Sequence, residues 1–190
     1  MFELLLIIAA LILYIGVYIM NDKEPPPWIL FREDLCSGCR ICMIACSLRH
    51  EGEVWLEASR IRIIELVPGI HVAVYCTRCH DHPCVDACPT GALVFDNEKF
   101  IVHVDESKCA LCGKCIDACP GSIPRIIPGK KGVVICDLCD GVPECVRVCQ
   151  LMGYNALILV HYEPRPQFKG FLKDPLEVSR KLKGKYFDGG

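Results

Sequence analysis

The sequence is poor in the apolar residues that ordinarily fill a protein core. With cysteine and the first 20 residues set aside, only about 65 apolar residues remain among the 170 from Asn21 onward, roughly 38 %, whereas ordinary domains contain about 45–50 %. Aliphatic and aromatic side chains are therefore too few to stabilise a large conventional core. Something else must fill the interior.

The chain also lacks an excess of charge of either sign. Its 21 Lys and Arg residues nearly balance 23 Asp and Glu residues, so the formal net charge is −2. This balance excludes a strongly basic nucleic-acid binder, and no nucleic-acid partner is expected. The sequence has no Gly-rich phosphate loop and no convincing nucleophile–base set. We therefore expect a protein that is not itself an enzyme.

Cysteine is the residue in excess, with 16 copies that form four groups of four. The first and third groups share the spacing C-x2-C-x2-C-x3-C, while the second and fourth widen the middle gap to x4 and x5. Such a repeat governs the fold of the chain that contains it. In order along the chain, the groups are Cys36, Cys39, Cys42 and Cys46; Cys76, Cys79, Cys84 and Cys88; Cys109, Cys112, Cys115 and Cys119; and Cys136, Cys139, Cys145 and Cys149.

Disulfides, structural zinc and iron–sulfur clusters all use cysteine, and the spacing discriminates among them. Four tight quartets are a poor disulfide framework, and structural zinc usually takes two C-x2-C pairs a dozen or more residues apart. Here each group spans only 11 to 14 residues, and Pro89 and Pro120 follow the last cysteine of the second and third groups. This pattern is typical of ferredoxins that bind 4Fe–4S clusters. Sixteen ligands would hold four such clusters, which would also cross-link the chain.

These motifs resemble those of the four-cluster ferredoxin-type electron-transfer subunits of molybdenum- and tungsten-pterin oxidoreductases, among them dimethyl sulfoxide reductase, formate dehydrogenase and tungsten aldehyde oxidoreductases. The resemblance covers roughly residues 29–162 and includes the order of the motifs and the segments CPTGAL from Cys88 and CALCGKC from Cys109. It departs at Ser47 and Gln150, where a free-standing ferredoxin would have Pro. The resemblance implies an α+β fold of two nested ferredoxin-like units with two clusters each.

The resemblance also implies that every cluster takes three cysteines from one group and one from another. The inner unit is then 76–119, and the outer unit combines 29–75 with 120–162. The implied ligands are Cys36, Cys39, Cys42 and Cys149 for cluster 1; Cys46, Cys136, Cys139 and Cys145 for cluster 2; Cys76, Cys79, Cys84 and Cys119 for cluster 3; and Cys88, Cys109, Cys112 and Cys115 for cluster 4.

Short secondary-structure elements are expected between the cysteines. Apolar alternation predicts a hairpin of strands 92–95 and 99–104 that turns at 96–98. Further strands are expected at 60–66, 71–75 and 156–162. Each C-x3-C stretch should form a short helix, at 41–48, 84–87, 115–118 and 145–148.

The two ends of the chain differ from its middle. Residues 4–20 are 17 consecutive uncharged residues, which predicts a transmembrane anchor helix within 1–20 in contact with the lipid bilayer, with a buried soluble helix as the alternative. A Pro-rich linker would follow at 21–28. Lys23 and Arg32 favour the cytoplasmic side for the clusters. The basic extension 163–190 should contain a helix that begins at Asp174 and lies against a partner, unless it is a solvated tail.

We therefore expect a membrane-anchored electron relay. Its partner would be a large Mo/W-pterin catalytic subunit, and aldehyde or formate oxidation is the favoured reaction. The electron acceptor would be a membrane, quinone, hydrogenase-type or ferredoxin partner. A stand-alone polyferredoxin and a zinc-stabilised interaction module remain as alternatives. Five basic residues lie beside ligands, where their positive charge would raise the reduction potential of a cluster or would only keep the surface soluble. They are Arg40, Arg78, Lys108, Lys114 and Arg147. His80 and His82 lie beside ligands too, while the other four histidines are expected to be structural: His50, His71, His103 and His161.

Overall fold

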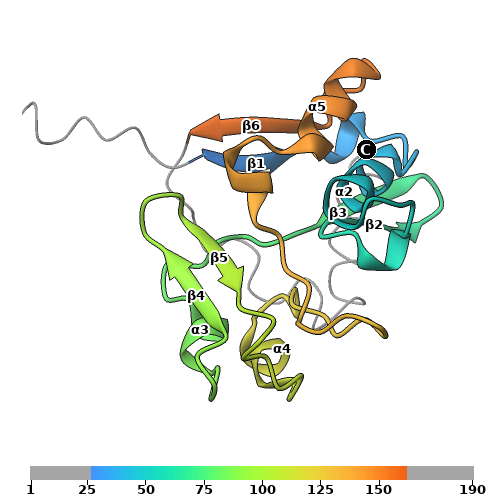
Figure 1. Ribbon diagram of the computed structural model, residues 1–190. Helices are drawn as coiled ribbons and strands as arrows, with labels where there is room; N and C mark the ends of the chain where they lie inside the picture. The colour runs from blue at the N-terminus through green and yellow to red at the C-terminus, as the bar shows by residue number, and fades with distance from the viewer. Residues whose placement is uncertain (1–26, 162–190) are drawn as a thin grey trace, which may run out of the picture.

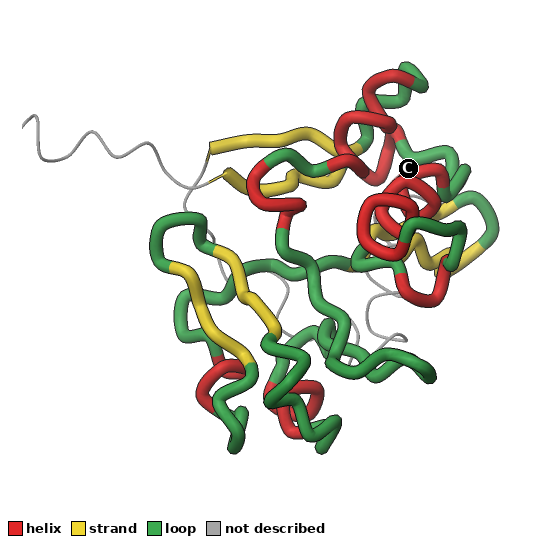
Figure 2. Tube along the Cα trace, viewed as in Figure 1, coloured by secondary structure: helices red, strands yellow, loops and turns green. Residues whose placement is uncertain are grey.

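A computed structural model describes residues 27–161, which form an α+β fold of short elements (Figures 1 and 2). The strands are β1 (Pro27–Phe31), β2 (Arg62–Val67), β3 (Ile70–Val74), β4 (Leu93–Asp96), β5 (Ile101–Val104) and β6 (Leu157–His161). The helices are α2 (Ile41–Glu51), α3 (Pro83–Asp86), α4 (Lys114–Ala118) and α5 (Glu144–Leu151), with 3-10 turns η1 (Glu33–Leu35), η2 (Leu56–Ala58) and η3 (Leu138–Gly141).

One unit is assembled from the two ends of the described chain. Strands β1 and β6 pair antiparallel, from Pro27 opposite His161 to Phe31 opposite Leu157. Helices α2 and α5 pack against each other beside this pair (Figure 1). The Tyr75 hydroxyl, just after β3, donates a 2.8 Å hydrogen bond to the carbonyl of Ile29 in β1. These contacts join segments from the two ends of the described chain.

The middle of the chain forms the second unit, around the hairpin of β4 and β5 (Figure 1). Its turn is fixed by Asp96, whose Oδ1 accepts hydrogen bonds from the backbone N–H groups of Glu98 and Lys99 at 2.8 and 3.0 Å. A short side-chain acceptor of this kind mimics a backbone turn. Helices α3 and α4 contact each other at the base of the hairpin. The predicted hairpin is confirmed.

Each unit has its own buried core, and cysteine contributes to both. The outer core contains Ile29, Ile61 and Leu157, and the inner core contains Leu93 and Val102. Buried thiols complete them: Cys42, Cys46, Cys136 and Cys145 in the outer core, and Cys84, Cys115 and Cys119 in the inner one. Sulfur thus occupies positions that aliphatic side chains fill in ordinary cores.

The elements predicted within residues 27–161 are present, and the structure contains one strand that was not predicted. A helix covers all or most of each of the four C-x3-C stretches, and the strands at 60–66, 71–75 and 156–162 correspond to β2, β3 and β6 within one or two residues. Strand β1 was not expected. It begins at Pro27, inside the segment 21–28 predicted as a linker, so that the outer unit starts at least two residues earlier. Its partner β6 lies about 130 residues away along the chain, and a pairing so distant leaves no local pattern.

Within residues 27–161, no helix is long and apolar enough to cross a membrane. The predicted anchor at 4–20 and the predicted extension at 163–190 lie outside the described residues.

Candidate iron–sulfur sites

All sixteen cysteines lie in the described part of the chain, and all are free thiols. The disulfide framework considered for the sequence is therefore absent from the structure. The thiols instead converge around hollows in the two units.

The first hollow lies between β1, α2 and α5 and has a volume of about 370 Å³, open solvent at its mouth included. Apolar side chains such as Phe31, Ile63 and Leu157 form part of its wall. Four thiols line it, and they belong to Cys36, Cys39, Cys42 and Cys149. These are the residues implied for cluster 1, and the fold brings them together from positions more than 100 residues apart.

The loop of this hollow passes close to a side chain of β3. Gly38 lies between Cys36 and Cys39 with φ +71°, a conformation that glycine adopts without strain. A Cβ atom at this position would overlap the ring of His71 from β3. Any other residue at position 38 would adopt a strained backbone conformation and would displace the ring of His71.

A second hollow, of about 350 Å³, lies in the inner unit and is lined by the thiols implied for cluster 3. They belong to Cys76, Cys79, Cys84 and Cys119. Val102, Ile123 and Ile135 cover it and exclude water. The backbone N–H of Ile123 donates to the sulfur of Cys119 at 3.4 Å.

A third hollow, of about 260 Å³, is lined by the thiols implied for cluster 4. They belong to Cys88, Cys109, Cys112 and Cys115. Thr90 places its hydroxyl 3.7 Å from the sulfur of Cys88. Cys112 is exposed, as is Cys39 at the first hollow, whereas Cys136 and Cys145 are buried.

The remaining four cysteines, implied for cluster 2, also lie close together. Cys145 interacts electrostatically with Cys46 and Cys139, and Cys136 with Cys145 and Cys46. The sulfur of Cys46 accepts a 3.2 Å hydrogen bond from the backbone N–H of Arg60. Cys145 also interacts with Cys42, and Cys136 with Cys76, so the thiols of this group reach those of neighbouring sets as well.

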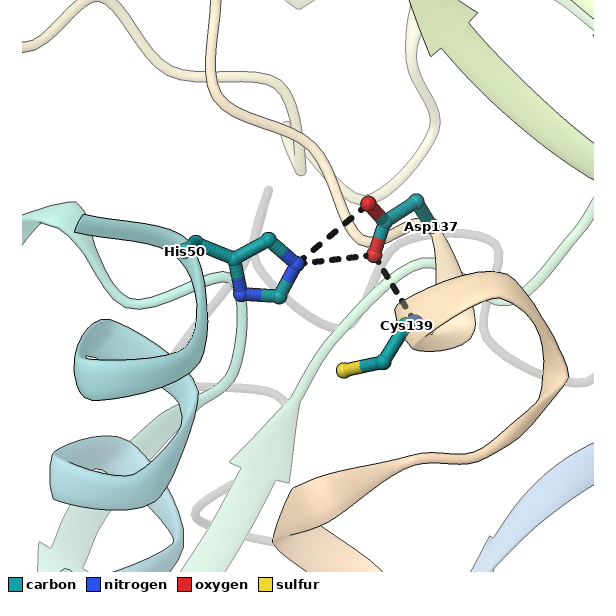
Figure 3. Close-up of side chains that lie close together, drawn as sticks. All are labelled: His50, Asp137 and Cys139. Carbon is teal, nitrogen blue, oxygen red and sulfur yellow. Dashed lines mark hydrogen bonds and ion pairs between the residues drawn. The ribbon is translucent and has the colours of Figure 1, made fainter. Parts of the chain in front are cut away.

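A histidine and an aspartate lie beside this fourth set (Figure 3). His50 Nδ1 donates to the carbonyl of Cys46 at 2.8 Å, and Nε2 donates to Asp137 Oδ1 at 3.0 Å. Because both ring nitrogens face acceptors, the geometry holds a doubly protonated imidazolium. Asp137 Oδ1 also accepts from the backbone N–H of Cys139 at 2.9 Å, so that the pair joins α2 to the loop that carries Cys139.

These contacts shift the pKa values of the pair in opposite directions. Burial alone would lower the pKa of His50, but the hydrogen bonds to Asp137, Cys139 and Cys46 outweigh it and raise that pKa. Burial would raise the pKa of Asp137, but the hydrogen bond from His50 holds it well below its usual range. The ligating atoms of His50, Asp137 and Cys139 all lie within 4.8 Å of one another. Since His50 and Asp137 already satisfy each other, we assign them to the surroundings of the thiols and not to a separate metal ion.

Several of the buried thiols resist ionisation in the absence of a cation. Burial, followed by repulsion between neighbouring thiolates, raises the pKa of Cys42, Cys76 and Cys84 to about 12. A bound metal inverts this preference, because a coordinating thiol is deprotonated outright. Four sulfurs around one hollow therefore fit a metal cluster, and the donor set of four thiols matches a 4Fe–4S cluster.

Sequence reasoning missed two features near the thiols. His50 was expected to be structural only, and Asp137 was not singled out. The signal for His50 was its position four residues after Cys46, which places both on one face of α2. Among the five basic residues beside ligands, Arg78 alone is buried, whereas Arg40, Lys108, Lys114 and Arg147 are exposed. His80 is exposed, and His82 stacks on Phe95 with 3.5 Å between ring centroids.

Comparison with known proteins agrees with this geometry. The family described as "4Fe-4S dicluster domain" (Fer4_7) matches residues 75–123, which include all eight cysteines of the inner unit. The chain is 52 % identical to the "Aliphatic sulfonate oxidoreductase, polyferredoxin-like subunit" of Pyrococcus furiosus over 164 residues, 84 % of this chain and 95 % of that protein. It is 34 % identical to the "Thiosulfate reductase electron transfer subunit PhsB" of Salmonella typhi, over 68 % of this chain and 74 % of that protein.

A solved structure with a similar chain is the "Active site complex BamBC of Benzoyl Coenzyme A reductase in complex with Zinc". It matches with a TM-score of 0.42 and 22 % identity over 87 % of this chain and 93 % of that one. This likeness is too distant to bear on function.

Proposed function

This chain belongs to the family of ferredoxin-like electron-transfer subunits of oxidoreductase complexes, and on that premise we propose that it relays electrons through four 4Fe–4S clusters between a catalytic subunit and an acceptor. The relatives are named as polyferredoxin-like or electron-transfer subunits, so the role is a non-catalytic one. When bound, each cluster accepts and donates one electron at a time. The observation that carries the proposal is the convergence of twelve of the sixteen free thiols on three hollows, four thiols to each.

The proposed ligand sets are those implied for clusters 1 to 4. Three of them line hollows in the fold, which supports the assignment. The thiols of Cys76 and Cys136 lie close enough to interact electrostatically with each other. Cys39 and Cys112, by contrast, are exposed to solvent. We therefore place clusters 1 and 4 at the two accessible ends of the path, with clusters 3 and 2 between them.

The protein's own contribution is to hold and shield these groups. Backbone N–H groups of Arg60 and Ile123 stabilise sulfur charge at Cys46 and Cys119. Aliphatic side chains around the hollow of cluster 3 keep water out, which strengthens each electrostatic contact inside.

For the partner we propose a large Mo/W-pterin catalytic subunit, with aldehyde or formate oxidation as the favoured reaction. The name of the Pyrococcus relative adds aliphatic sulfonates to the substrates that an assay should include. Residues 4–20 would anchor the complex in the membrane with the clusters on the cytoplasmic side, close to a membrane, quinone, hydrogenase-type or ferredoxin acceptor. This placement depends on the apolar run and on Lys23 and Arg32.

Two cysteines of the same helix provide the decisive experiment. Cys145 and Cys149 lie four residues apart in α5, but they are assigned to clusters 2 and 1. In the purified holoprotein, Cys149→Ser should remove the same electron paramagnetic resonance signal as Cys39→Ser. Cys145→Ser should instead remove the signal that Cys46→Ser removes. Each variant should retain about 12 of about 16 iron atoms.

Other outcomes would discriminate among the alternatives. If Cys149→Ser and Cys145→Ser lost the same signal, the shared-ligand assignment would be wrong. Zinc in place of iron, without the broad absorbance near 400 nm, would favour the zinc-stabilised module. A protein that carries clusters but exchanges electrons freely with unrelated soluble enzymes would favour the stand-alone polyferredoxin.

A further inference from the structure

A buried arginine lies where the inner and outer units meet. The side chain of Arg78 has a relative exposure of only 5 %. Its Nε donates to the carbonyl of Phe100, and its Nη2 donates to the carbonyl of Lys99 at 3.3 Å. The guanidinium lies over the ring of Phe100, with 5.8 Å between Cζ and the ring centroid. These contacts fix the position of the charge.

This guanidinium has no carboxylate partner among residues 27–161. The ion pairs of the described residues do not include Arg78, and both of its acceptors are neutral carbonyls. Its third nitrogen, Nη1, is buried without any hydrogen-bond partner. A buried charge is costly unless it is paired, so an anionic group must compensate it.

Two thiols from different units supply the candidate anions. Arg78 lines the hollow of cluster 3, and its backbone N–H hydrogen-bonds the sulfur of Cys76. The charges that act on its guanidinium are those of Cys76 and Cys136. Cys76 belongs to the ligand set of cluster 3, and Cys136 to that of cluster 2.

The arginine also contacts the turn of the β4–β5 hairpin, and this turn reaches the outer unit. Lys99, whose carbonyl accepts from Arg78, forms a 3.1 Å ion pair with Asp140 in η3, next to the cluster 2 ligand Cys139. The guanidinium therefore lies at a junction, and its charge is available to groups on both sides.

We propose that Arg78 is a positioning residue of the electron path, whose buried guanidinium raises the reduction potentials of clusters 2 and 3 together. The proposal rests on the proposed function and deepens it. An electron that arrives on either side adds negative charge beside a fixed positive one, and no proton is needed to compensate it. The two central sites are thereby matched to each other, which favours transfer across the boundary between the units.

Arg62 provides a matched control within the same chain. It is half-buried, less than Arg78, and its Nη2 is likewise unpartnered, but burial alone accounts for its lowered pKa and no thiol acts on it. A substitution at residue 62 therefore removes a similar cation from a similar environment without removing a charge from beside the thiols of clusters 2 and 3.

The test is a redox titration of the full-length holoprotein, followed by electron paramagnetic resonance. In Arg78→Gln, two of the four signals should shift to lower potential while the other two stay in place and the iron content is unchanged. The shifted signals should be those that Cys46→Ser and Cys84→Ser abolish. Arg62→Gln should leave all four in place. Arg78→Lys, which retains the charge but not the fork of donors, should shift the same two signals by less.

Arg78 could instead have a structural role only, as a link to the hairpin turn. In that case, Arg78→Gln would lower thermal stability with all four potentials unmoved, and the proposal would be overturned. A uniform shift of all four signals would overturn it as well. If Arg78→Gln does not retain its iron, Arg78→Lys decides: no shift, or a shift of the signals of clusters 1 and 4, contradicts the proposal. Iron content and signal number in the unaltered protein test the proposed function separately.

Discussion

Glu51, at the end of α2, is the acidic centre of a buried ion network that holds the two parts of the outer unit together. Its side chain is only 7 % exposed. One carboxylate oxygen pairs with Arg60, and the other pairs with Lys130 Nζ at 2.6 Å, while the cations themselves are 14 % and 18 % exposed. Lys130 lies 79 residues further along the chain. Loss of this carboxylate would leave two largely buried cations without their anion.

We therefore expect Glu51→Gln to destabilise the holoprotein strongly. Removal of one partner from a buried ion pair costs about 3–5 kcal/mol, because an uncompensated charge remains. For a described part of 135 residues, this loss corresponds to a decrease in melting temperature of about 10–20 °C. Because cluster loss makes unfolding irreversible, the assay should follow the decay of absorbance near 400 nm without oxygen at several fixed temperatures. Glu53→Gln is the matched control, since Glu53 lies two residues away and is exposed.

The stability that Glu51 contributes should depend on pH, and the sign of this dependence follows from its pKa. Burial acts to raise the pKa of Glu51, but hydrogen bonds from Lys130 and Arg60 outweigh it and hold the pKa below the usual 4.5. A lowered folded-state pKa contributes stability that is complete above the unfolded value and is lost as the pH falls through the folded value. The difference in stability between the unaltered protein and Glu51→Gln should be largest near neutral pH and should become smaller below about pH 4.5. Equal stability of Glu51→Gln and Glu53→Gln at neutral pH would refute the reasoning.

Three further predictions follow from the site and from the sequence. Gly38→Ala should abolish cluster 1, because the new Cβ would overlap the ring of His71, and the protein should lose the signal that Cys39→Ser also removes. Gly52 also has a positive φ but open space around it, so Gly52→Ala should lower the free energy of unfolding by only about 1 kcal/mol and retain all iron. Apoprotein prepared without iron should be largely unfolded, and dispersed NMR signals from it would contradict the account of the core. Native protein should remain in the membrane fraction in high salt and require detergent for release, whereas release by salt alone would count against an anchor at residues 4–20.

The cysteine groups could be recognised in the sequence because their spacing is a local signature. The cysteines of each group lie within a few residues of one another, and the helix at each C-x3-C stretch is equally local. The hairpin of β4 and β5 was predictable for the same reason, since its turn at Asp96 is encoded by adjacent residues. Short-range spacing is sufficient wherever both partners of a contact lie in one segment.

Contacts between distant segments were not predictable in this way. Strand β1 exists because β6 offers it a partner, and its proline-rich start suggested a linker. The ion pair of His50 and Asp137 joins residues 87 positions apart. The burial of Arg78 likewise depends on the hairpin turn that covers it. In each case the residue types were visible in the sequence, but their environment was created only by the folded chain.

The shortage of apolar residues in the sequence and the charges buried near the thiols have one physical origin. An ordinary core tolerates neither an unpaired guanidinium nor several adjacent thiolates, because transfer of a lone charge from water is costly. Here the thiols of both cores lie within reach of cations such as His50 and Arg78, and Arg78 has no carboxylate of its own among the described residues. Metal clusters with thiolate ligands would supply both the volume that aliphatic side chains lack and the negative charge that these cations need. The clusters would then stabilise the fold, and their reduction potentials would be set by the same buried cations. Substitution of a residue such as Arg78, which acts on the clusters through its charge, allows the effect on the potentials to be measured separately from the effect on folding.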